Sequence, residues 1–243
     1  MLNNEFKTGV IRPVECYKEG WELIKDQYWL LFGITLVGAL IGGASLYILF
    51  GAMICGIFYC YFQKIDGRAF KFEDLFKGFN YFLPGLVVVI FIVVPIIVVY
   101  IFIYLPFIAA IVMSPKLSSG ELTTLILSAA AIDLVFIVLM VCLHTLLIFA
   151  FPLVVDRNLS GFQAMKLSAR AVWNNLSGVA GLFVVGFGIN LVGAMLFCVG
   201  IYFTVPIIIA GNIVAYRKVF PRPENQIFNP PPPDAYRGAG SYN

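Results

Sequence analysis

Two ionisable side chains, Asp133 and His144, lie inside long apolar runs, where a charged group marks a candidate functional site. His144 follows Asp133 by about three helical turns, so both side chains share one helix face, roughly 16 Å apart along the axis. Asn190 and Asn212 lie in later apolar runs and are candidate hydrogen-bond partners. Together these residues predict an intramembrane polar site, in which Asp133 binds a proton or cation and His144 passes protons on.

A structural interpretation of the same residues stays open. Asp133 then hydrogen-bonds Asn190 and holds two helices in register. A relay needs several ionisable groups along a path, and one Asp with one His is few. No G-x-S-x-G, H-E-x-x-H or phosphate-loop motif occurs, and a lone histidine cannot build a multi-histidine metal site. We expect no catalytic residue, no metal and no cofactor.

Composition indicates the class of protein. Of 243 residues, 61% are hydrophobic and 12% are charged, and the mean hydropathy is +0.94. A soluble domain carries about 25% charged residues. We therefore expect an integral membrane protein, and an all-α one, because helices satisfy their own backbone groups in lipid. Nothing in the charge distribution indicates nucleic-acid binding.

Uncharged apolar runs predict a polytopic transmembrane helix bundle with six spans. The expected spans are 28–44, 46–63, 82–112, 122–151, 178–197 and 200–216. One span needs about 20 residues, so the run 28–63 is short for two. Two short spans and a re-entrant hairpin both stay open for it. Residues 1–220 are expected to form one membrane domain, and a proline-rich flexible tail follows at 221–243.

Three amphipathic segments precede the membrane runs, at 13–27, 68–80 and 160–175. Their polar and apolar residues recur at helical spacing, which is typical of interfacial helices that lie in the plane of the membrane surface. In the third segment, Ser160 and Gln163 have the spacing of a capping box. The arrangement suggests an internal repeat of one surface helix and one membrane segment.

The third segment follows a polar turn that we interpret as a structural elbow. Asp156 and Arg157 are expected to form an ion pair that orients the next helix. Trp173 lies just before a Gly-rich run, as Trp21 does in the first segment, and this likeness favours a parallel repeat.

Helix packing has one local signal. Gly38 and Gly42 form a G-x-x-x-G pattern, which lets another helix approach closely.

Basic residues predict the orientation. With the N-terminus in the cytosol, all of the 16 Lys and Arg residues except Lys116 fall in cytosolic segments. This asymmetry follows the positive-inside rule, so both termini are expected in the cytosol. The run Pro230–Pro233 in the tail is of a type that docks cytosolic proteins.

The stretch PLVVDRNLSGFQAMKLSARAVWNN, followed by a Gly-rich hairpin, Pro206 and AYRKVF, resembles a broad group of poorly characterised bacterial six-helix membrane proteins. The group includes the membrane domains attached to some glycerophosphoryl diester phosphodiesterases. The resemblance implies a location in the bacterial cytoplasmic (inner) membrane. It implies no catalytic residues, because the chemistry of the phosphodiesterase relatives belongs to a separate soluble domain.

The expected function is that of a non-catalytic membrane scaffold or accessory subunit of a membrane complex. Its expected partners are the lipid bilayer and another membrane protein or a second copy of the chain. The alternative is a small transporter or channel with a proton or cation site at Asp133. Flux assays and the presence of a wet cavity around Asp133 separate the two functions.

Overall fold

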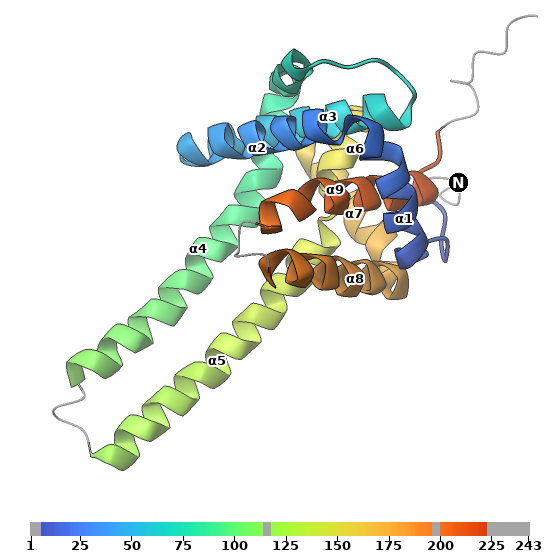
Figure 1. Ribbon diagram of the computed structural model, residues 1–243. Helices are drawn as coiled ribbons and strands as arrows, with labels where there is room; N and C mark the ends of the chain where they lie inside the picture. Colours follow the sequence, from blue (N-terminus) through green and yellow to red (C-terminus); the bar gives the residue numbers. More distant parts are fainter. Residues whose placement is uncertain (1–5, 114–117, 196–199, 223–243) are drawn as a thin grey trace, which may run out of the picture.

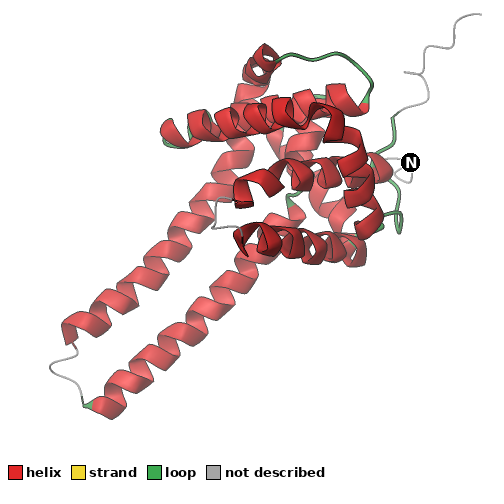
Figure 2. Cartoon of the chain, in the orientation of Figure 1, coloured by secondary structure: helices red, strands yellow, loops and turns green. Residues whose placement is uncertain are grey.

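A computed structural model describes residues 6–113, 118–195 and 200–222, and these residues form helices joined by turns, without a strand among them (Figures 1 and 2). The helices in chain order are α1 (Pro13–Ile24), η1 (Lys25–Gln27), α2 (Tyr28–Ala44), α3 (Phe50–Ile65), η2 (Phe72–Tyr81), α4 (Phe82–Met113), α5 (Ser119–Leu146), α6 (Ala150–Arg157), α7 (Gly161–Trp173), α8 (Leu176–Met195) and α9 (Gly200–Val219). The helices η1 and η2 have 3₁₀ geometry. The predicted all-α class is confirmed.

Five helical segments of the described chain are long and apolar enough to cross a membrane, and this indicates a membrane protein. They are Pro13–Ala44, Phe72–Leu105, Ser119–Arg157, Leu176–Met195 and Gly200–Val219. The sixth apolar helix, α3, has 16 residues and is shorter than the other five segments.

The predicted span 122–151 contains a helix break, between α5 and α6. Buried Ser168 of α7 reaches this break. Its hydroxyl donates to the Leu146 carbonyl (2.7 Å) and accepts from the Phe149 amide (3.1 Å). A helix break leaves backbone groups without partners, and one hydroxyl can satisfy both a donor and an acceptor.

The element order repeats three times as a short helix followed by a hairpin. The first unit is α1 with α2 and α3, the second is η2 with α4, α5 and α6, and the third is α7 with α8 and α9. The helix η2 packs on α3 and α7 packs on α6, so each contacts the helix that ends the preceding hairpin. The first helix, α1, closes the circle by packing on α9. The three units therefore interlock.

The amphipathic segment predicted at 68–80 forms η2, and its 3₁₀ geometry was not predicted. Residues three apart eclipse in such a helix, and the buried residues Leu75 and Gly78 have this spacing. Gly78 allows η2 to touch the α3 backbone, since an added Cβ would lie 2.0 Å from the Ala52 carbonyl oxygen. A Cβ at Gly56 of α3 would lie 1.9 Å from the Leu75 oxygen. Side chains at these two positions would force the helices apart.

The first amphipathic helix, α1, packs against other helices along one face. Its buried residues are Cys16, Tyr17, Gly20 and Ile24. Gly20 meets the backbone of Gly211 in α9, where an added Cβ would lie 2.7 Å from the Gly211 nitrogen. The Tyr17 hydroxyl donates to the Leu182 carbonyl of α8 (3.1 Å). The first unit is thereby fixed to the third.

The second hairpin is longer than the other two and leaves the packed body. Figure 1 shows α4 and α5 running side by side away from the remaining helices. With 32 and 28 residues, they are about 48 and 42 Å long, against about 26 Å for the 17 residues of α2. No residue of α5 is buried. The hydrocarbon core of a bilayer is about 30 Å thick, so this hairpin is long enough to cross it at a tilt.

Candidate functional site

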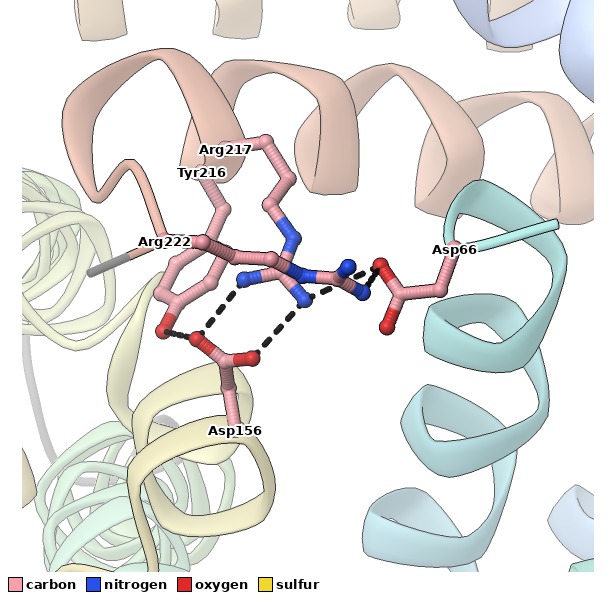
Figure 3. Close-up of polar contacts among 5 residues, drawn as sticks. All are labelled: Asp66, Asp156, Tyr216, Arg217 and Arg222. Atoms are coloured by element: carbon pink, nitrogen blue, oxygen red, sulfur yellow. Dashed lines mark hydrogen bonds and ion pairs between the residues drawn. The ribbon is translucent and has the colours of Figure 1, made fainter. Parts of the chain in front are cut away.

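Five side chains meet in a charged junction, formed by Asp66, Asp156, Tyr216, Arg217 and Arg222 (Figure 3). The side chains of Asp66, Asp156 and Arg217 are only 11%, 17% and 14% exposed. Removing one partner of an ion pair this far from water costs much more than it does on an open surface, because the remaining charge is poorly solvated.

Arg217 is the centre of the charged junction. Its Nη1 donates to Asp156 Oδ2 (2.9 Å) and its Nη2 lies 2.8 Å from Asp156 Oδ1, which makes a two-point ion pair. Its Nη2 also reaches Asp66 Oδ1 (3.4 Å), and Arg222 pairs with the same oxygen. The Tyr216 hydroxyl donates to Asp156 Oδ2 (2.7 Å). The Arg217 guanidinium lies 4.7 Å from the ring centre of Phe62, a favourable cation–π distance.

The charged junction forms where the three hairpins end. Asp66 follows the last residue of α3, Asp156 lies in the last turn of α6, and Arg217 lies in the last turn of α9. The C-terminal end of a helix carries partial negative charge. Three such ends and two carboxylates therefore create a negative potential, which Arg217 and Arg222 offset. The junction holds the three repeat units together at one point.

The structure pairs Asp156 with Arg217 and not with Arg157, so the predicted elbow ion pair is wrong. Consecutive helix residues do not face each other, and the Arg157 guanidinium lies over the Phe220 ring, 5.1 Å from its centre. The Asp156 carboxylate thus joins α6 to α9, and α6 also packs on α7.

The predicted capping box is confirmed at the start of α7. The Gln163 amide donates to Ser160 Oγ (3.5 Å), and the Ser160 amide donates to Gln163 Oε1 (3.4 Å). Trp173, at the end of the same helix, is 71% exposed. A second capping box, between Ser118 and Glu121 at the start of α5, was not predicted, although its S-x-x-E spacing is visible in the sequence.

Asn175, just after α7, is a structural residue that sequence reasoning missed. Its side chain is buried, accepts from the Gly9 amide (2.7 Å), and donates to the Lys7 and Ala171 carbonyls (3.1 and 2.9 Å). The Lys7 amide in turn donates to the Val219 carbonyl (2.8 Å). The N-terminal segment is therefore bound to the third unit.

The candidate intramembrane pair lies on α5, within the second hairpin. Asp133 Oδ1 is buried and has no hydrogen-bond partner in the described chain. His144 Nδ1 lies 2.8 Å from the Met140 carbonyl, which requires a proton on this nitrogen. His144 also lines an apolar cavity of about 430 Å³ between α4, α5 and α8, whose walls include Tyr100 and Phe183. The lining of this cavity does not include Asp133.

Asn190 and Asn212 were the candidate hydrogen-bond partners of Asp133. Asn190 of α8 accepts a hydrogen bond from the Thr204 hydroxyl of α9 (2.7 Å), so it joins the two helices of the third hairpin. Asn212 is partly buried in α9, and its side chain makes no hydrogen bond to any described residue. The structure does not bring either asparagine into a hydrogen bond with Asp133.

Gly38 and Gly42 both lie on the inner side of α2. An added Cβ at Gly38 would lie 2.9 Å from the Ile57 Cδ1 of α3, and one at Gly42 would lie 2.7 Å from the Phe50 Cδ2. The G-x-x-x-G face is thus turned toward the second helix of its own hairpin.

Two predictions remain, one on metal binding and one on the C-terminal tail. Among the described residues, no three His, Cys, Asp or Glu side chains gather in a way that could hold a metal ion. The proline run of the predicted tail lies outside the described residues.

The described part of the chain is all-helical and contains five candidate membrane spans. Comparisons with protein-family models, curated proteins and solved structures found no match in any of the three. The resemblance to bacterial six-helix membrane proteins therefore stays a prediction.

Proposed function

We propose that the chain is a non-catalytic integral membrane protein, a scaffold or accessory subunit that binds another membrane protein through its second hairpin. The observation that carries this proposal is the difference between the hairpins. The first and third pack into the body, while α4 and α5 extend from it with most of their apolar side chains exposed. A helical surface of this size in a membrane is covered by lipid or by another protein.

The proposed placement uses all three hairpins. They supply six membrane segments, and α1, η2 and α7 lie at the cytosolic interface of a bacterial inner membrane, with both termini in the cytosol. The exposed tryptophans support a position of these helices at the membrane–water interface, where Trp is enriched. Trp21 is 42% exposed, and Trp29 and Trp173 are each 71% exposed. The concentration of Lys and Arg in the same segments supports the cytosolic side.

The composition of α5 favours a protein partner over lipid alone. Ser128, Ala130 and Ala131 are exposed on this helix, and small residues let a second helix approach closely. Asp133 lies two residues beyond Ala131, is partly exposed, and has one buried oxygen, Oδ1, that lacks a partner in the described chain. A carboxyl group within the membrane is costly, and a polar group on a partner helix that reached its other oxygen, Oδ2, would lower this cost.

Affinity purification in mild detergent tests the proposal. A double variant, Leu134→Ser with Val138→Ser, changes two exposed side chains of α5 (63% and 53% exposed). We expect the variant to fold as the wild type does and to lose a specific co-purifying membrane protein. The matched control is Leu40→Ser with Val184→Ser, which changes exposed residues of α2 and α8 (62% and 71%).

Recovery of the same partner with both double variants would contradict the role of the second hairpin. Recovery of a monomer without partner from wild-type membranes would contradict the scaffold function itself.

A transporter or channel is the second candidate, and the unpartnered Asp133 oxygen favours it. In this function Asp133 takes up a proton or cation between α4 and α5. Asp133→Asn should then abolish pH-driven flux in liposomes, because the amide cannot ionise. Flux that is unchanged by the substitution would refute this function.

A further inference from the structure

A small polar cavity of about 150 Å³ lies against the charged junction and is separate from the second hairpin's apolar cavity. Asp66, Asp156 and Arg222 of the junction form part of its wall. The remaining polar wall comes from four side chains that the junction does not use, namely Tyr59, Gln63, Arg68 and Tyr81. The cavity thus joins the last turns of α3 and α6 to the end of η2.

Three of the four carboxylate oxygens of this wall are already bound. Both oxygens of Asp156 are bound by Arg217, and one also accepts from Tyr216. Asp66 Oδ1 is bound by Arg217 and Arg222. Around the cavity, three guanidinium groups, those of Arg68, Arg217 and Arg222, therefore stand against two carboxylates. Of the three, only the Arg68 guanidinium has no carboxylate partner in the described chain.

Several hydrogen-bond donors on the wall lack an acceptor. The Arg68 guanidinium, the Gln63 amide group and the Tyr81 hydroxyl make no ion pair or hydrogen bond within the described chain. The Tyr59 hydroxyl lies 3.5 Å from Lys77 Nζ, which can only donate, so the phenol proton is free for another acceptor. Free donors that line one cavity and include a guanidinium group are the features of an anion site.

We propose that this cavity binds a phosphate group, with Arg68 as the charged contact and the Tyr59 and Tyr81 hydroxyls and the Gln63 amide as additional donors. The source that best fits the position is a phospholipid headgroup. The cavity opens beside the polar ends of apolar helices, where headgroups lie if the chain is placed in the membrane as proposed above. The inference rests on that membrane placement and not on the docking of α4 and α5.

Binding of short-chain phosphatidylglycerol to the full chain in detergent, measured by calorimetry, tests the inference. Arg68→Gln should weaken the affinity about tenfold or more, since a hydrogen-bonded charge pair contributes that much. Tyr59→Phe removes one hydroxyl and should weaken it about fivefold. The matched control is Lys166→Gln, which removes an equal charge from an exposed residue of α7 and should change the affinity less than about twofold.

Two further ligands separate the sources. Short-chain diacylglycerol lacks the phosphate and should not bind. If inorganic phosphate binds as tightly as the lipid and loses the same affinity in Arg68→Gln, the phosphate site is supported and its source is a soluble anion.

Equal affinity of the wild type and Arg68→Gln for phosphatidylglycerol, or an equal loss in Lys166→Gln, would overturn the inference. Both results leave partner recovery through the second hairpin unaffected, so the two proposals fail independently.

Discussion

The first and second hairpins each follow a short amphipathic helix, yet only the first hairpin packs against the body along its whole length. The first has helices of 17 and 16 residues, and glycines bring its backbone close to its neighbours. The second has helices of 32 and 28 residues, and only the part near the body is packed. At the base of the second hairpin, Gly85 of α4 meets Gly51 of α3. At its far end, by contrast, a Cβ added to Gly120 of α5 would have no neighbour within 4 Å.

The distal part of α4 and α5 contributes little to the packing that holds the fold together. The three units interlock through their short helices, and the charged junction joins the ends of their hairpins. The extension of the second hairpin contributes little buried surface to this assembly, and this is the surface that the proposed partner would cover.

The largest expected difference between the hairpins concerns the depth of their turns. Within the segment Pro13–Ala44, the apolar helix α2 alone has 17 residues and spans about 26 Å, less than a hydrocarbon core of about 30 Å. The turn of the first hairpin exposes Leu46 (84%) and Ile48 (57%), and the Leu46 and Ile48 amides donate to the Gly43 and Ser45 carbonyls. The turn satisfies part of its backbone internally and presents apolar side chains, both of which a turn that stays within the membrane requires.

In a chain whose cysteines are replaced, Ser118→Cys should therefore react fully with an impermeant thiol reagent added from outside. Leu46→Cys should not react. Equal labelling of both positions would show that the first hairpin crosses the membrane as the second does.

A matched pair of leucines tests the packing of the body against that of the hairpin. Leu153 of α6 is fully buried, and Leu134 of α5 is 63% exposed. Leu153→Ala should lower the free energy of unfolding by about 3 kcal/mol, because it leaves a cavity. Leu134→Ala should change it by less than about 0.5 kcal/mol. Unfolding in mixed dodecyl maltoside and SDS micelles, followed by circular dichroism, measures both, and similar losses would contradict the division into body and extension.

The charged junction gives the next largest effect. Asp156→Ala leaves the Arg217 guanidinium without its two-point partner, and we expect a loss of about 2 kcal/mol, below the value for a fully buried pair because the site is partly exposed. Glu22→Ala removes a carboxylate from the exposed Glu22–Lys25 pair and should have little effect. Equal stability of the two variants would refute the structural role of the junction.

A glycine pair should give a smaller effect. Gly78→Ala places a methyl group against the Ala52 carbonyl and should destabilise the chain by about 1–2 kcal/mol. Gly188→Ala in α8 meets no neighbour within 4 Å and should leave the chain equally or slightly more stable, since alanine favours a helix. Thermal unfolding of both variants in one detergent measures the difference, and a stable Gly78→Ala variant would contradict the close contact of η2 with α3.

Local features of this fold could be predicted from the sequence, and long-range ones could not. The α2 bounds and the Ser160–Gln163 capping box depend on neighbouring residues alone. The break after Leu146 depends on a hydroxyl from Ser168, which reaches it only in the folded chain. The 3₁₀ helix η2 likewise packs closely on α3, and this contact cannot be predicted from the residues next to it in sequence.

The charged junction was predicted only in part. Asp156 was singled out, but it was assigned to the adjacent Arg157, whereas its partner Arg217 comes from the third unit. The repeat itself held the missing signal, because Asp66, Asp156 and Arg217 all lie at the ends of hairpins.

Photo-crosslinking in intact membranes tests most directly whether the second hairpin carries the partner. Benzoylphenylalanine is placed at Leu134 of α5 or at Leu40 of α2, two positions of almost equal exposure (63% and 62%). We expect a discrete protein adduct from residue 134 and none from residue 40. Adducts of the same protein from both positions, or from neither, would contradict a docking role of the second hairpin.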